Sequence, residues 1–136
     1  MKTLKLLLAG LLLSGVLGSG ESFGAAASQA TRTDSGGGVT IKVTFVDSKT
    51  SNDLRFQVVL DTHSVNLDGY DLKTISVLRD DAGNTYSRTA VENKGSGHHR
   101  ETIVSFAKVA TGTKRVELVV RDVAGVKERI FRWDLQ

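Results

Sequence analysis

The sequence contains no cysteine and no proline, and only 6% of its 136 residues are aromatic. Without cysteine the protein has no disulfide framework, no thiolate metal site and no thiol nucleophile. The same absence excludes a lipid anchor attached through a cysteine. A small domain of this composition must be stabilised by its apolar core, and proline does not stiffen its loops.

The chain also lacks a large excess of positive or negative charge. The net charge is +3 for the whole chain and about +2 without residues 1–27, which hold two lysines and one glutamate. Basic and acidic residues are interleaved, as in VKERIFR (126–132) and LRDD (78–81). Nucleic-acid-binding domains usually carry a basic face or stripe. We therefore expect no nucleic acid among the partners.

Residues 1–27 have the features of a secretory signal peptide. Two lysines precede an apolar run at 6–17 (LLLAGLLLSGVL), which is shorter than the roughly 20 residues of a membrane-spanning helix. A membrane anchor is the alternative. The small residues at 25–30 (AAASQA) suit a signal peptidase, and we predict cleavage after Ala27 or nearby. The mature chain would then be a bacterial periplasmic or secreted protein without a membrane span.

The remaining chain divides into a short leader and one domain. Residues 28–38 (SQATRTDSGGG) are small and polar, which predicts a flexible Gly/Ser-rich leader outside the core. Residues 39–136 show apolar side chains at every second position, separated by polar turns. This alternation is typical of half-buried strands. Seven strands are expected, at 39–46, 54–60, 74–79, 85–91, 102–107, 115–121 and 129–135.

Seven short strands in one domain predict an all-β fold, an immunoglobulin-like antiparallel β-sandwich. The disulfide of antibody domains is missing, so the prediction concerns architecture alone. The side chains expected to face inward are Val39, Ile41, Val43, Phe45, Leu54, Phe56, Val58, Leu60, Ile75, Val77, Val104, Phe106, Val116, Leu118, Val120, Phe131, Trp133 and Leu135.

The order of the strands places alternate connections at opposite ends of the sandwich. The second, fourth and sixth connections share one end, and they contain all three histidines of the chain. His63 is therefore expected to lie at the same end as His98 and His99. Loops held by a rigid scaffold are where binding residues usually lie.

Two or three imidazoles with a carboxylate are a common ligand set for Cu²⁺ or Zn²⁺. We predict a metal site formed by His63, His98, His99 and Asp61. Asp61 and His63 are two residues apart and would point to the same side of a strand. In the alternative interpretation His63 bonds backbone groups of its own loop, and the histidine pair is solvated or packs on a sheet edge.

Other chemistry has less support in the sequence. The loop SVNLDGYD (64–71) contains part of a calcium-binding pattern, but Ser64 and Ile75 stand where acidic ligands are required. Turns closed by Asn and Asp side chains, with Gly69 at positive φ, explain this loop better. No serine has the context of a nucleophile. We therefore predict that the protein is not an enzyme.

Several stretches resemble recurring segments of a group of small bacterial exported β-sandwich proteins. The stretches are LDTHSVNLDGYDL, LRDDAGN, GSGHHR and VAGVKERIFRWDL, and they cover most of residues 56–135. Among their residues are His63, His98, His99 and Arg100. A serine stands in GSGHHR where the group would have another glycine. The resemblance implies an exported β domain and carries no catalytic residue.

These observations together predict a non-enzymatic binding or accessory protein of the cell envelope. Its ligand would be Cu or Zn, held by the loop histidines. The alternative is a structural or protein–protein interaction module without metal. In that case the same end of the domain, or an exposed strand edge, would dock an envelope protein partner.

Overall fold

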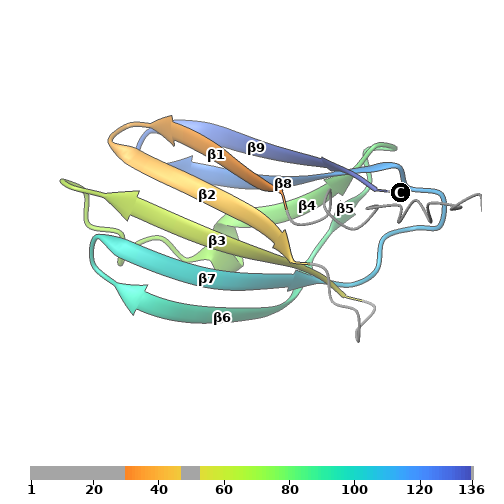
Figure 1. The fold of residues 1–136 in the computed structure, drawn as a ribbon, viewed down its shortest axis with the longest axis horizontal. Helices are drawn as coiled ribbons and strands as arrows, with labels where there is room; N and C mark the ends of the chain where they lie inside the picture. The colour runs from red at the N-terminus through yellow and green to blue at the C-terminus, as the bar shows by residue number, and fades with distance from the viewer. Residues whose placement is uncertain (1–29, 47–52, 136) are drawn as a thin grey trace, which may run out of the picture.

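The computed structural model describes residues 30–46 and 53–135. Within these ranges the chain forms nine strands and one helical turn (Figure 1). The elements are β1 Thr31–Gly36, β2 Val39–Val46, β3 Leu54–Thr62, α1 Leu72–Ile75, β4 Ser76–Asp80, β5 Thr85–Tyr86, β6 Arg88–Ser96, β7 His99–Phe106, β8 Arg115–Val123 and β9 Val126–Asp134.

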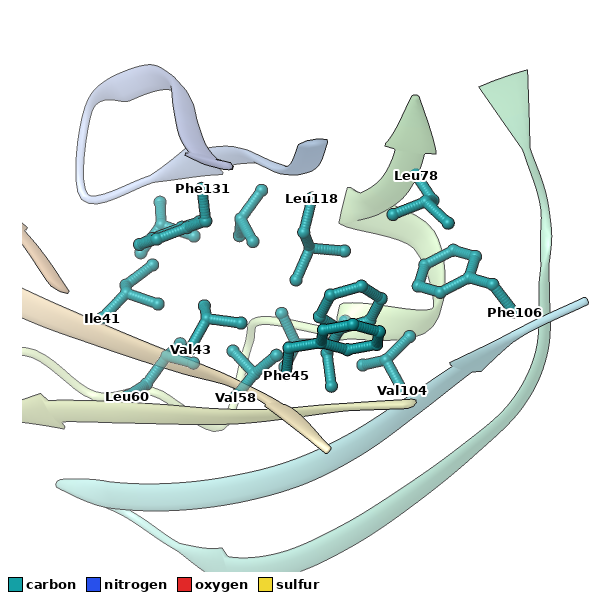
Figure 2. Packing of buried hydrophobic residues seen from close by; sticks show 14 of the residues in the cluster. Ile41, Val43, Phe45, Val58, Leu60, Leu78, Val104, Phe106, Leu118 and Phe131 are labelled. Carbon is teal, nitrogen blue, oxygen red and sulfur yellow. The ribbon is translucent and has the colours of Figure 1, made fainter. Parts of the chain in front are cut away.

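The strands form two antiparallel sheets. The first has the order β1-β2-β3-β7-β6 and the second the order β5-β4-β8-β9. The two sheets face each other, and side chains from both fill the space between them (Figure 2). The predicted all-β sandwich is therefore confirmed.

The core follows from the alternation seen in the sequence. Every second residue of β2 is buried, and the same holds for most of β3 and β8. Four aromatic residues form its centre. The ring centroids of Phe45, Trp133 and Phe106 lie 5.0, 5.1 and 5.9 Å from that of Phe56, and the Phe45 ring is stacked on it. Each fully buried side chain of this kind contributes about 1.5–3 kcal/mol. Leu54 and Leu135 are only partly buried.

The prediction of a flexible leader is wrong for residues 31–36. These residues form β1, which pairs with β2 from Thr31↔Thr44 to Gly36↔Val39. Gly37 and Gly38 make the turn, with φ values of 61° and 80°. Two successive positive φ angles are typical of the two-residue turn that matches the twist of a β-hairpin. The glycines that suggested flexibility therefore close a hairpin.

A buried arginine attaches this hairpin to the second sheet. The side chain of Arg129, on β9, is 0% exposed. Its guanidinium donates to the Asp34 carboxylate at 2.8 Å and to the carbonyl oxygens of Gly36 at 2.7 Å, Val39 at 3.2 Å and Val123 at 3.2 Å. Its Nε is buried without a partner among the described residues. The alternating pattern of the sequence did not reveal this contact.

The expected strand at 74–79 is also displaced. Leu72–Ile75 form a helical turn, which the Asp71 side chain caps by accepting from the Lys73 amide. Strand β4 begins at Ser76 and buries Ser76, Leu78 and Asp80, so the prediction that Val77 faces inward is wrong. Ile75 is partly buried against the core, as predicted. The polar residues can occupy inward positions because their side chains find hydrogen-bond partners.

Candidate functional site

Four turns meet at one end of the sandwich, on the left in Figure 1. They are the β1–β2 turn, the loop between β3 and α1, the β6–β7 turn and the β8–β9 turn. The Thr62 amide donates to His98 O at 3.1 Å, and the Leu67 amide donates to Gly97 O at 3.1 Å. We call this region, built around residues 61–71 and 97–100, the histidine end. The prediction that all three histidines share one end is confirmed.

Thr62 joins two of these turns. Its side chain is buried, and its hydroxyl donates to Gly38 O at 2.7 Å. The same oxygen accepts from the backbone amides of Ser64 at 3.2 Å and Val65 at 3.1 Å. A hydroxyl that satisfies three backbone groups fixes the start of the loop against the β1–β2 turn.

Arg100 and Asp68 attach the same loop to the β6–β7 hairpin. The Arg100 guanidinium donates to Leu67 O at 2.7 Å and also to Tyr70 O. The Asp68 carboxylate accepts from the Gly97 amide at 2.8 Å. Within the loop, Asn66 accepts from the Asp68 amide at 2.9 Å, which confirms the predicted turn closed by an Asn side chain. Gly69 is not among the residues with positive φ, so that part of the prediction is wrong.

The adjacent histidines are oriented by different acceptors. Nδ1 of His98 lies 3.2 Å from Val65 O, and Nδ1 of His99 contacts the Asp61 carboxylate. A carbonyl oxygen only accepts, so His98 must carry its proton on Nδ1, and a carboxylate favours the same tautomer in His99. In the neutral ring the lone pair then lies on Nε2. Both imidazoles are exposed, with His99 63% exposed.

His63 lies apart from this pair. It is exposed and lines an open depression of about 310 Å³, together with Gly38, Thr40, Asp61 and Thr62. Asp61 thus faces His99 on one side and borders the same depression as His63. No hydrogen bond links His63 to His98 or His99 within the described ranges.

The predicted four-residue metal site is not assembled as expected. Among residues 30–46 and 53–135, no group of three His, Cys, Asp or Glu side chains is arranged to hold a metal ion. Asp61 bonds the imidazole of His99 and therefore occupies the position of an outer-shell partner, the group that orients a metal-binding histidine. The structure brings Asp61 and His99 together and leaves His63 and His98 with other neighbours.

Among residues 30–46 and 53–135, two carboxyls have shifted pKa values, and both lie away from the histidine end. Hydrogen bonds from the Asn84 side chain, from Tyr86 Oη and from backbone amides lower the pKa of Asp80. Hydrogen bonds from Arg132 and Arg79 lower the pKa of Glu117 on the outer face of the second sheet. Both carboxylates are held by structural donors, so neither is suited to act as a proton donor near neutral pH.

Sequence reasoning missed the residues that organise the site, Thr62 and Arg100. Thr62 lies two residues after Leu60, at the next inward position of β3, and this position was the available signal. Arg100 was quoted only as part of a segment.

In the part of the chain that the structure describes, no helix is long and apolar enough to span a membrane. Comparisons with protein-family models, with curated proteins and with solved structures find no match for this chain.

Proposed function

We propose that this chain is an exported, non-catalytic binding module of the bacterial cell envelope, and that the histidine end binds a Cu²⁺ or Zn²⁺ ion. The observation that carries the proposal is the orientation of His98 and His99. Each imidazole uses Nδ1 to bond an oxygen acceptor, Val65 O or the Asp61 carboxylate. Metal-binding histidines use the same arrangement, with Nε2 left for the metal.

The ligand set is small. His99 is the principal ligand because a carboxylate partner makes its imidazole a stronger donor, and His98 is the second. No third His, Cys, Asp or Glu joins them in the described part of the chain. The remaining coordination positions would be filled by water or by a group of a partner molecule.

The proposal is tested by titrating residues 28–136 with Cu²⁺ and with Zn²⁺ while histidine side-chain resonances are recorded. Binding should perturb Nε2 of His99 first. His99→Ala should remove most of the affinity, and Asp61→Asn should lower it by about 10–100-fold because the outer-shell acceptor is lost. Affinity should fall as the pH is lowered, because a histidine must be neutral to bind a metal ion.

His63→Ala is the matched control, because it removes an exposed histidine from the same end of the domain. It should leave metal affinity unchanged. Wild-type protein that binds no more tightly than His99→Ala would refute the metal proposal. An affinity that depends on His63 and not on His99 would contradict the assignment of ligands.

A second candidate, a protein-interaction module, is favoured by β6. This strand has nine residues, forms an edge of the first sheet and is mostly exposed. An unpaired strand edge can accept a strand from a partner. A bulge between Arg88 and Ala90, together with the charges of Glu92 and Lys94, restricts such pairing. A metal titration without any response would favour this candidate.

A further inference from the structure

The strand edges of the two sheets differ in what they offer to a partner. β5 has only two residues. β1 and β9 lie side by side, and the buried Arg129 of β9 bonds Asp34 and Gly36 O of β1 (Figure 1). β6 is the remaining edge, and among the described residues only β7 pairs with it. It is therefore the edge to which another strand can be added.

The regular part of β6 is bounded on both sides. A bulge lies between Arg88 and Ala90, and a two-residue turn follows Ser96. The stretch from Ala90 to Ser96 can thus form an uninterrupted ladder, and Asn93 is its midpoint. A strand that pairs with a second copy of itself in antiparallel order does so about a two-fold axis. The axis that uses the whole stretch passes through Asn93.

The charges of this stretch select the same axis. Glu92 and Lys94 flank Asn93, and both side chains are exposed on the outer face of the first sheet. With the axis at Asn93, Glu92 of each copy lies opposite Lys94 of the other. Moving the axis by one residue places Glu92 opposite Glu92 or Lys94 opposite Lys94, and like charges directly opposite each other are destabilising. The charges that restrict pairing with other strands therefore favour this one.

The backbone of Asn93 is directed toward the open edge. Just before β7, the carbonyl oxygen of His98 accepts from the Thr62 amide of β3 at 3.1 Å. Backbone groups of successive strand residues point to alternate sides. Glu101, three residues further on, therefore bonds toward β6, where its partner is Lys94. Asn93 is the next residue along β6, so its N–H and C=O point away from β7.

We propose that two copies of this chain pair through β6, in antiparallel order about a two-fold axis at Asn93. The two copies of Asn93 exchange their backbone hydrogen bonds, and the first sheets of both chains become one continuous sheet. The Asn93 side chain is held within its own chain, where Oδ1 accepts from the Thr102 hydroxyl at 3.0 Å. Lys94 lies between Glu101 of its own chain and Glu92 of the second copy. The pairing goes beyond the metal site and does not depend on it.

The size of the contact sets the expected strength of the dimer. Pairing along one strand buries less than the roughly 1,600 Å² of a standard interface, so the dimer should form in a concentration-dependent way. Sedimentation equilibrium of residues 28–136, which contain all the described strands, measures this directly. Wild-type protein that stays monomeric up to about 1 mM would overturn the proposal.

Charge reversal tests the register. Glu92→Lys and Lys94→Glu should each weaken self-association about tenfold or more, because like charges then face each other twice. An equimolar mixture of the two variants should dimerise again, because each variant supplies the charges that the other lacks. Lys42→Glu is the matched control: it makes the same charge change on exposed β2 and should leave association unchanged. Single variants that associate as the wild type does, or a mixture that stays monomeric, would overturn the register.

The mixture also separates loss of pairing from damage to the fold. Glu92 lies 3.8 Å from Arg55 in its own chain, so Glu92→Lys removes that ion pair as well. A variant damaged in this way would not regain association when mixed with Lys94→Glu.

Amide hydrogen exchange identifies the surface that pairs. The Asn93 amide should exchange more slowly as the protein concentration rises, because it is bonded only in the dimer. The Lys94 amide faces β7 and serves as the internal reference, with the same exchange rate at every concentration. A dimer in which Asn93 exchange does not depend on concentration would use another surface, and the proposal would be wrong.

Discussion

Arg129 offers the clearest test of how the two sheets are joined. Replacing it with methionine keeps much of the apolar stem and removes the donors to three carbonyl oxygens, those of Gly36, Val39 and Val123. A buried carbonyl oxygen left without its donor costs about 1–3 kcal/mol, so the loss of these bonds costs about 3 kcal/mol or more. Domains of this size have a total stability of about 5–15 kcal/mol, so the loss is a large fraction of it.

Asp34 provides the matched comparison. Its side chain is 46% exposed, so solvent screens its attraction to Arg129. Asp34→Asn should therefore cost only about 1 kcal/mol. The contrast separates two explanations of the contact. If the hydrogen bonds from Arg129 to the carbonyl oxygens dominate, Arg129→Met should destabilise the fold far more than Asp34→Asn. If the ion pair dominates, the two variants should lose similar amounts of stability.

Both variants can be measured by thermal unfolding, followed through the fluorescence of the single tryptophan, Trp133. Arg129→Met should lower the melting temperature by roughly 12 °C or more, and Asp34→Asn by about 4–8 °C. Arg129→Lys should be intermediate, because lysine keeps the charge with fewer donors. Similar losses for Arg129→Met and Asp34→Asn, or a methionine variant as stable as the wild type, would refute this reasoning.

Three further predictions concern turns and pH. Gly37→Ala should lower the free energy of unfolding, measured in urea, by about 3 kcal/mol or more, because an added Cβ would lie 2.0 Å from a backbone oxygen of the β8–β9 turn. Gly83→Ala, with open space around it, should lower the free energy of unfolding by about 1 kcal/mol. Thr62→Val should lower the free energy of unfolding by about 1–3 kcal/mol, because three backbone groups lose their hydrogen-bond partner. Thr85→Val, at an exposed position of β5, should have little effect on the free energy of unfolding. The lowered pKa of Asp80 means that its carboxylate stabilises the fold above about pH 4 and that this stability is lost as the pH falls through the folded-state pKa. Asp80→Asn should therefore flatten the decline of the urea midpoint below about pH 4. An unchanged slope would contradict this.

The alternation of apolar residues was enough to predict most of the fold. It identified the inward faces of β2, β8 and β9 correctly, and strand order then placed the three histidines at one end. It failed where a local structure shifted the pattern. The helical turn α1 moved the register of β4 by one residue, so Leu78 and not Val77 is buried.

The contacts that organise the site could not be read from periodicity. The hydrogen bonds between Arg129 and the β1–β2 hairpin join residues 90 or more positions apart. The Arg100 side chain bonds carbonyl oxygens 30 and 33 positions away. A charged residue in a strand gives no sign that its side chain will be buried against backbone oxygens. The orientation of His98 also depends on a long-range contact, with Val65 O, which the sequence pattern did not predict.

The central claim is that His98 and His99 are held with Nδ1 protonated and Nε2 free to bind. It is tested most directly by a ¹⁵N–¹H correlation spectrum of the histidine rings at pH 8, without metal. The account predicts the Nδ1–H tautomer for both residues, with an unprotonated Nε2, because Nδ1 bonds Val65 O in one ring and Asp61 in the other. The Nε2–H tautomer in both rings, or free exchange between tautomers, would contradict it.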